Sequence, residues 1–336
     1  MTSISRRKFA RISSIASLSL ILPFNLKAFL KYKHMTDIKH FDIIIVGGSY
    51  SGLAAGMALG RALKKVLIID NGQPCNRQTP TSHNFITQDG KTPKEIATLA
   101  KHQVEQYDTI RFFNGLAIKG AKTNNGFEIQ VSSGEIFFAK KLIFATGIKD
   151  IMPSIEGYAE CWGISVLHCP YCHGYEVKGG KTGILGNGNF GFEFSVLILN
   201  WTKDLTLFTD GKSVLTSEQT VKLQSHNIKI IEKVIEKLEH KCGYLESIRF
   251  KDGSTLPVRA MYAHSEFKQN CMIPKDLGCE LTEEGYIKVD NLQKTSIHGI
   301  FACGDNTTRM RTVANSTAMG TTAGIAISKE MIFEDF

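Results

Sequence analysis

Outside its first 34 residues, the 336-residue chain has almost no excess of charge of either sign. The formal net charge of +8 looks basic, but residues 1–34 hold seven Lys and Arg residues and no Asp or Glu. The remainder therefore has 33 basic residues against 32 acidic ones. A protein that binds DNA or RNA normally presents a basic face. The even charge of the body argues against nucleic acid as a partner.

The sequence also lacks a cysteine framework and extended low-complexity segments. Only Cys169 and Cys172 form a close pair, and no second pair follows at the spacing of a zinc finger. The other six cysteines are scattered: Cys75, Cys161, Cys242, Cys271, Cys279 and Cys303. This usage excludes a small disulfide-stapled scaffold. With 43% hydrophobic residues, the chain is long enough to bury two ordinary cores, so we expect two domains.

The first 34 residues form a basic and apolar leader. Residues 5–9 (SRRKF) match the twin-arginine export pattern, and the apolar stretch 12–22 is typical of a signal sequence. Because that stretch is too short to span a bilayer comfortably, we expect no stable membrane span. We expect export by the twin-arginine route, to the periplasm or the cell surface. The alternative is translation from Met35 and a cytoplasmic protein, since no clean cleavage site follows the apolar stretch.

Residues 41–70 have the pattern of a strand, turn, helix and strand that bind a dinucleotide. The run 41–46 (FDIIIV) predicts a strand buried on both faces, followed by a helix over 53–63 and a strand over 65–69. Such a turn brings backbone N–H groups against a pyrophosphate, and an acid after the second strand bonds a ribose hydroxyl. The candidate cofactor ligands are Gly47, Gly48, Ser49, Ser51, Gly52 and Asp70. A glycine-rich turn without a ligand is the alternative.

A second unit of the same kind begins with a predicted strand at residues 182–185. The turn GNGNFG, a helical stretch and a strand at 205–208 follow. The candidate nicotinamide ligands are Gly186, Gly188, Gly191 and Asp210. An NADPH site usually has arginines after the second strand to hold the 2′-phosphate. Asp210 would repel that phosphate, which favours NADH over NADPH. The alternative is a unit that keeps the fold and binds no nucleotide.

The pair Cys169 and Cys172 lies just before the second unit, in the sequence HCPYCHG. Two cysteines at this spacing near strand–helix–strand patterns indicate a redox dithiol, in which one thiol attacks a disulfide and the other resolves it. The reactive form is the thiolate, and His168 and His173 flank the pair as a base or a positive neighbour. Zinc binding and inert thiols are the alternatives.

Two further segments connect the first unit to a flavin. Residues 141–147 predict a buried strand that ends in Ala145, Thr146 and Gly147, and residues 299–305 predict another that ends in Gly304 and Asp305. An acid in this position can accept hydrogen bonds from a ribityl chain. Taken alone, Asp305 could equally be a helix N-cap.

These motifs, in this order, resemble the low-molecular-weight thioredoxin reductase family over about residues 40–333. The resemblance implies a noncovalent FAD, a homodimer and an inserted pyridine-nucleotide domain that carries the cysteines. It also implies that Cys172 faces the flavin while Cys169 attacks the substrate, either a small dithiol or disulfide or a thioredoxin-like protein.

The sequence departs from that family at two positions. His173 stands where typical members have an aspartate that serves as general acid, and the arginine cluster after Phe208 is missing. Residues 169–176 (CPYCHGYE) are more similar to the dithiol oxidases of gliotoxin and holomycin biosynthesis. In those, electrons pass from a dithiol through the cysteine pair to FAD and then to oxygen. His173 is suited to be the base that removes thiol protons.

We therefore predict an α/β fold with two Rossmann-like, three-layer dinucleotide-binding domains. The FAD domain comprises residues 40–153 and 283–336, and the nicotinamide-like domain with Cys169 and Cys172 is inserted as residues 154–282. The predicted function is an FAD-dependent thiol–disulfide oxidoreductase that uses Cys169, Cys172 and His173. An oxygen-dependent dithiol oxidase with a vestigial nicotinamide site is one alternative, and a flavin-binding redox sensor without turnover is another.

Overall fold

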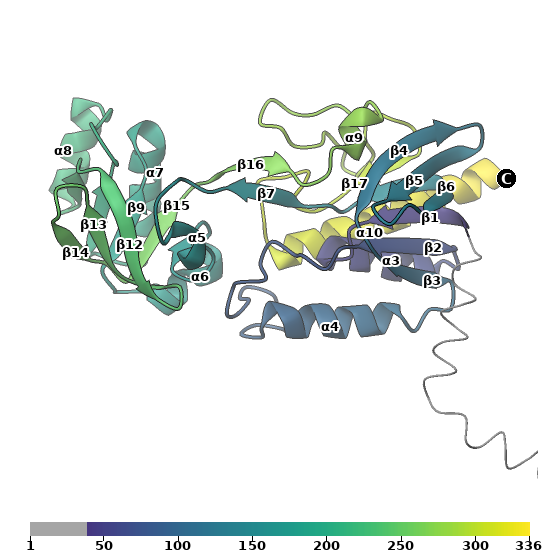
Figure 1. The fold of residues 1–336 in the computed structure, drawn as a ribbon, viewed down its shortest axis with the longest axis horizontal. Helices are drawn as coiled ribbons and strands as arrows, with labels where there is room; N and C mark the ends of the chain where they lie inside the picture. Colours follow the sequence, from purple (N-terminus) through teal and green to yellow (C-terminus); the bar gives the residue numbers. More distant parts are fainter. Residues whose placement is uncertain (1–38) are drawn as a thin grey trace, which may run out of the picture.

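The computed structural model describes residues 39–336. The predicted leader and the alternative start at Met35 lie outside the described residues. Figure 1 shows that the described chain forms two lobes, which a pair of extended strands connects.

The first lobe is built on a seven-stranded sheet in the order β3-β2-β1-β6-β5-β4, with β17 also paired to β6. Its strands are β1 (His40–Val46), β2 (Val66–Asp70), β3 (Ile110–Asn114), β4 (Ala117–Thr123), β5 (Gly126–Val131), β6 (Ile136–Phe144) and β17 (Ile300–Ala302). β1 pairs in parallel with β2 and β6, and β17 pairs in parallel with the end of β6. The carboxyl ends of these strands therefore lie at one edge of the sheet, where dinucleotides bind in such folds.

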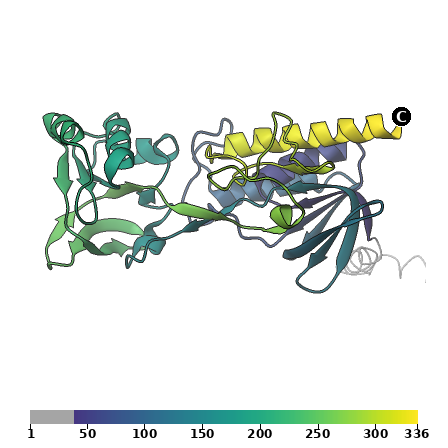
Figure 2. The ribbon, with the colours of Figure 1, turned by 90° about the horizontal axis from the view of Figure 1, so that it is seen from above.

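The two faces of this sheet are covered differently. Three helices cover one face: α3 (Tyr50–Arg61), α4 (Pro93–Val104) and α10 (Val313–Asp335). Ile43 and Ile45 of β1 pack toward these helices, whereas Ile44 and Val46 pack toward the β4–β5 hairpin and α9 (Ile273–Asp276). Since both faces of β1 are buried, its sequence is apolar nearly throughout. Figure 2 shows α10 running alongside α3, with which it packs closely.

The second lobe contains a five-stranded parallel sheet in the order β11-β10-β9-β15-β8. Its strands are β8 (Val166–Leu167), β9 (Thr182–Leu185), β10 (Leu205–Phe208), β11 (Lys229–Ile231) and β15 (Ala260–Ala263). Helices α7 (Gly188–Ile198) and α8 (Ser217–Ser225) cover one face. A three-stranded antiparallel sheet of β12 (Ile235–Lys241), β13 (Tyr244–Phe250) and β14 (Thr255–Pro257) covers the other, together with α5 (Tyr158–Cys161).

Two antiparallel strands carry the chain between the lobes. β7 (Ile148–Ile151) leaves the first lobe, and β16 (Glu266–Gln269) returns beside it. The predicted fold class, two Rossmann-like domains with the second inserted into the first, is confirmed. Residues 270–282, which the prediction places in the inserted domain, pack on the first lobe, where Ile273 and Leu277 join its core. They do so because the chain has already returned through β16.

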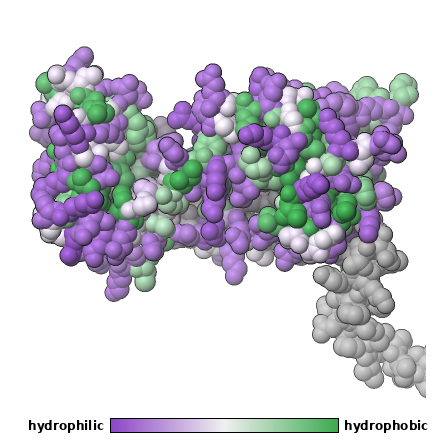
Figure 3. Space-filling model, turned by 45° about the horizontal axis from the view of Figure 1, so that its top comes forward, coloured by the Kyte–Doolittle hydropathy of each residue, from purple (hydrophilic) through white to green (hydrophobic). Residues whose placement is uncertain are grey.

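The surface is that of a two-lobed protein with mixed polar and apolar patches. Figure 3 shows mostly hydrophilic side chains, with separate hydrophobic patches on both lobes. Among residues 39–336, every helix is either too short or too polar to cross a bilayer.

Candidate active site

The turn after β1 brings the chain close to the strands beside it. Gly47 has a φ of +105°, which a side chain rarely adopts, and a Cβ there would lie 2.2 Å from the Ala145 carbonyl oxygen. A Cβ on Gly52 would lie 1.9 Å from the Gly47 carbonyl oxygen. Ser49 is the N-cap of α3, and within the described part of the chain its side chain makes no capping hydrogen bond. The first amides of α3 are thereby left for a ligand.

A cavity of about 580 Å³ opens beside this turn. Nine of the predicted cofactor ligands line it: Gly47, Gly48, Ser49, Ser51, Asp70, Ala145, Thr146, Gly147 and Asp305. Gly52 and Gly304 support its wall from behind, since a Cβ on Gly304 would lie 2.6 Å from the Ser51 hydroxyl oxygen. Asp70 accepts a hydrogen bond from the Gly48 amide at 3.1 Å. Residues far apart in sequence are thus brought together as the dinucleotide pattern predicts.

Asp305 lies on the cavity wall and does not cap a helix. The N-cap of α10 is Thr312, whose side chain accepts a hydrogen bond from the Asn315 amide. The Ser316 hydroxyl donates to Asp305 at 3.1 Å, and the Cys75 thiol donates to it at 3.6 Å. Burial raises the pKa of the Asp305 carboxyl, and the positive charge of Arg311 opposes that rise.

Arg311 is a cavity residue that the sequence pattern does not single out. It donates two hydrogen bonds to Asp150, at 2.7 and 2.9 Å. Its Nε is buried, lies 3.8 Å from Oδ2 of Asp305 and, among the described residues, has no hydrogen-bond partner. Arg311 lines the cavity, so its positive charge lies near any ligand that the cavity holds.

Asp150 also connects the cavity to the second lobe. It accepts a hydrogen bond from the Trp162 indole at 3.2 Å, and the Trp162 ring stacks on His168 with centroids 5.7 Å apart. His168 precedes Cys169 and lines the cavity. Burial, helped by Arg311, lowers the pKa of His168 to about 3. His168 is therefore neutral near pH 7 and is not a positive neighbour for the thiols.

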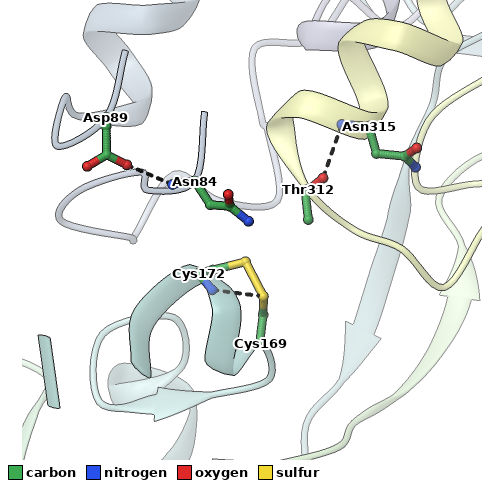
Figure 4. The surroundings of a disulfide bond; sticks show 6 residues. All are labelled: Asn84, Asp89, Cys169, Cys172, Thr312 and Asn315. Carbon is green, nitrogen blue, oxygen red and sulfur yellow. Dashed lines mark hydrogen bonds between the residues drawn. A yellow bond between two sulfur atoms is a disulfide. The ribbon is translucent and has the colours of Figure 1, made fainter. Parts of the chain in front are cut away.

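Cys169 and Cys172 form a disulfide at the start of α6 (Pro170–Val177), with their Cα atoms 5.3 Å apart. Cys169 is the N-cap residue, and its sulfur accepts a hydrogen bond from the Cys172 amide at 3.1 Å. After reduction, the same amide and the helix N-terminus would stabilise a thiolate on Cys169. Figure 4 shows the disulfide facing the start of α10, where Thr312 and Asn315 lie.

His173 follows Cys172 on α6 and is partly buried. Burial lowers the pKa of its imidazole, the Glu176 carboxylate raises it, and His83 lowers it. The net direction is downward, so His173 is mostly neutral at neutral pH and can accept a proton.

The second glycine motif lies in the other lobe and is covered by its own side chains. The Asn187 side-chain oxygen accepts hydrogen bonds from the amides of Gly188 and Val214, both at 2.9 Å. A Cβ on Gly188 would lie 3.3 Å from the Val214 side chain. Gly186 and Gly191 pack against each other behind this turn. One amide at the N-terminus of α7, where a pyrophosphate would bind, is thus bonded within the chain.

Asp210 follows β10 in the left-handed region, with a φ of +50°. Its Oδ1 accepts a hydrogen bond from the Ile235 amide at 2.7 Å, and the residue is exposed. One carboxylate oxygen thereby anchors the start of β12. The role of Asp210 toward a ribose stays a prediction.

A family model described as pyridine nucleotide-disulphide oxidoreductase matches residues 41–320. Thioredoxin reductase tcpT of Claviceps purpurea is 32% identical, over 87% of this chain and 94% of its own length. Thioredoxin reductase sirT of Leptosphaeria maculans is 28% identical, over 88% of this chain and 95% of its own.

Solved structures agree with these relatives. An oxidoreductase from Agrobacterium tumefaciens is 33% identical with a TM-score of 0.82, covering 88% of this chain and 99% of its own. The crystal structure of HlmI is 27% identical with a TM-score of 0.83, covering 88% of this chain and 94% of its own.

The disulfide beside a dinucleotide-type cavity is the centre of an oxidoreductase that acts on thiols and disulfides. The chain belongs to the pyridine nucleotide-disulphide oxidoreductase family, in its thioredoxin reductase-like branch. The predicted enzyme class and thiol–disulfide function are confirmed. Membership of this family implies, in general terms, a flavin and a pyridine nucleotide as cofactors.

Proposed function

We propose that this protein is an FAD-dependent dithiol oxidase. In this proposal the disulfide of Cys169 and Cys172 receives two electrons from a small dithiol, and a bound FAD would supply the route from the reduced cysteines to oxygen without a nicotinamide donor. The observation that carries the proposal is the second glycine motif, in which the Asn187 side chain accepts a hydrogen bond from the Gly188 amide at the start of α7 and Val214 lies against Gly188.

The first lobe supports FAD as the bound cofactor. Gly47 and Gly52 allow the turn to pack tightly on Ala145 and α3, because a Cβ on either would collide with backbone, and a tight turn of this kind lies against the pyrophosphate in dinucleotide folds. Asp70 at the end of β2 would accept a hydrogen bond from a ribose hydroxyl of the bound FAD. Asp305 and Arg311 add a carboxylate and a positive charge to the same cavity. When bound, FAD would supply a two-electron acceptor beside the disulfide.

The chemistry of the cysteine pair is a thiol–disulfide exchange. One substrate thiolate attacks a sulfur of the Cys169–Cys172 disulfide, and a mixed disulfide forms as the S–S bond breaks. The second substrate thiolate attacks the mixed disulfide, which releases the substrate disulfide and leaves both cysteines reduced. His173, neutral at neutral pH, accepts a substrate thiol proton. We assign the substrate-facing role to Cys169, since the α6 N-terminus stabilises it as a leaving thiolate.

The lack of an arginine cluster for a 2′-phosphate and the predicted export signal both argue against NADPH as the electron donor. After β10 the chain offers Asp210 and a single Lys212 where a 2′-phosphate would need cations. Export by the twin-arginine route would place the enzyme where nicotinamide is not supplied. We therefore propose a small dithiol as the substrate, with a thioredoxin-like protein as the alternative partner.

We also propose a homodimer, which the exposed apolar side chains of Ile325 and Phe333 on α10 favour.

A second candidate function is an NADH-driven disulfide reductase. The exposed Asp210 at the end of β10 favours it, because a carboxylate in that position can bond a free ribose diol. This candidate requires the loop around Val214 to move away from Gly188.

Anaerobic mixing of the purified protein with a dithiol, NADH or NADPH separates these functions. We expect dithiothreitol to bleach the flavin rapidly and in a saturable way, and NADPH to bleach it at least about 100-fold more slowly, because Asp210 repels the 2′-phosphate. Stopped-flow absorbance measures both rates, and photoreduction of the same sample is the control that the flavin can be reduced. Rapid, saturable bleaching by micromolar NADPH would overturn the proposal and restore an ordinary reductase.

A further inference from the structure

The loop between β2 and α4 reaches across to the second lobe. Gln78 donates hydrogen bonds to the backbone carbonyls of Ala159 and Trp162, at 3.2 and 3.3 Å. Five residues later, the Nε2 of His83 lies 3.5 Å from Oε1 of Glu176, on the helix that carries the disulfide. The loop therefore joins the cavity lobe to α6 at two points.

The His83 imidazole is held by contacts within its own loop. Its Nδ1 lies 3.4 Å from Oδ2 of Asp89, and its Nε2 lies 3.0 Å from the Thr81 hydroxyl. The other oxygen of Asp89 accepts a hydrogen bond from the Asn84 amide at 2.7 Å, the bond drawn in Figure 4. Asn84 and Thr87 have φ values of 58° and 70°, which few non-glycine residues adopt. One nitrogen of the imidazole thus faces an acid, and the other lies between the Thr81 hydroxyl and the Glu176 carboxylate of α6.

Glu176 stands three residues after His173 on α6, so the two side chains share one face of the helix. The charged groups that act on His173 are Glu176 from its own helix and His83 from the loop, and the neutral His168 before α6 also lies close enough to be coupled to it. Those around His83 are Asp89 from its own loop and Glu176 from α6. The Glu176 carboxylate therefore contacts the loop imidazole and also acts electrostatically on His173, the base of the reaction.

We propose that His83 is a positioning residue of the dithiol reaction: through Glu176, it holds α6 against the first lobe and keeps His173 in place to accept the thiol proton. This inference rests on the proposed function and assigns to the first lobe a residue that controls the chemistry of the second. His83 does not touch the sulfur atoms in this role. A displacement of the disulfide by about 1 Å is enough to reduce such a rate substantially.

Replacing Glu176 and replacing His83 should shift the pKa of His173 in opposite directions. Glu176 raises the pKa of His173, so Glu176→Gln should lower it and move the acid limb of the turnover–pH profile to lower pH. His83 lowers the pKa of His173, so a neutral residue at position 83 should raise it and move the same limb to higher pH. Because His173 acts in its neutral form, the limb follows its pKa in both cases.

The test compares His83→Ala, His83→Gln and Glu176→Gln in the flavin-loaded, full-length protein, with His102→Ala as a control. His102 is an exposed histidine on α4, away from the disulfide. Steady-state oxygen consumption with dithiothreitol gives kcat and KM at each pH. We expect His83→Ala to lower kcat about tenfold with little change in KM, and His102→Ala to match the wild type. His83→Gln should recover much of kcat, since its amide can donate to Glu176, but should keep the shifted pH limb.

Unchanged kcat and an unmoved pH limb in His83→Ala would overturn the inference. So would a lower melting temperature as the only effect, because that result would give His83 a purely structural role. A wild type that turns over only with NADH and a disulfide would instead refute the proposed function. The same variants, measured in that direction, would then decide whether His83 positions the cysteine helix.

Discussion

Replacing Cys169 by serine is expected to lower dithiol turnover by about 1,000-fold or more, because no disulfide then remains to accept the substrate electrons. Cys172→Ser should lose turnover to a similar extent, but by a different route. In that variant Cys169 can still form a mixed disulfide with an oxidised substrate, and the thiol that would resolve it is absent. Mass spectrometry of the protein after exposure to a disulfide should find an adduct on Cys169 in the Cys172→Ser variant.

The matched control is Cys242→Ser, which removes an exposed cysteine of the second lobe that has no place in the disulfide. It should keep wild-type turnover and flavin content. Wild-type turnover in both the Cys169→Ser and Cys172→Ser variants would contradict the assignment of the working dithiol. An adduct on Cys172 in Cys169→Ser, with none on Cys169 in Cys172→Ser, would reverse the roles of the two sulfurs.

The local elements of the site could be predicted because each depends on a short stretch of sequence. A buried parallel strand, a turn that only glycine can make and a small-residue helix follow one another within residues 41–63, and all three were found nearly where expected. The pair Cys169 and Cys172 is also local, since two cysteines at this spacing can close a ring at a helix start. Such signals do not depend on the rest of the fold.

Other parts of the site depend on contacts that no sequence window contains. Arg311 and Asp150 are 161 residues apart, and their ion pair forms only because β7 runs beside the start of α10. The contact between His83 and Glu176 joins the two lobes and likewise has no sequence signal. The sequence left two roles for Asp305, an acceptor for a ribityl chain or a helix N-cap. The structure excludes the second role, because Thr312, seven residues later, is the N-cap of α10.

The cover over the second glycine motif also could not be predicted from its spacing. The turn GNGNFG has the residues of a nucleotide site, and only the fold shows the Val214 loop lying on it. A side chain that replaces a ligand at a helix N-terminus leaves the glycines unchanged. The pattern therefore indicates the fold of this lobe more firmly than it indicates a bound nicotinamide.

Replacing Gly52 by valine is expected to yield colourless or insoluble protein. A Cβ at this position would lie 1.9 Å from the Gly47 carbonyl oxygen and 3.4 Å from the Ala145 side chain, so the turn must move away from α3. Overpacking of this kind lowers the free energy of unfolding by about 3 kcal/mol, and the displaced turn can no longer approach a pyrophosphate.

Ala54→Val on the same helix is the matched control, because it adds a branched side chain at a partly exposed position. The visible flavin absorbance and the melting temperature measure both effects, and the control should keep its flavin. A Gly52→Val protein that stays yellow and melts with the wild type would show that the first turn does not hold the cofactor.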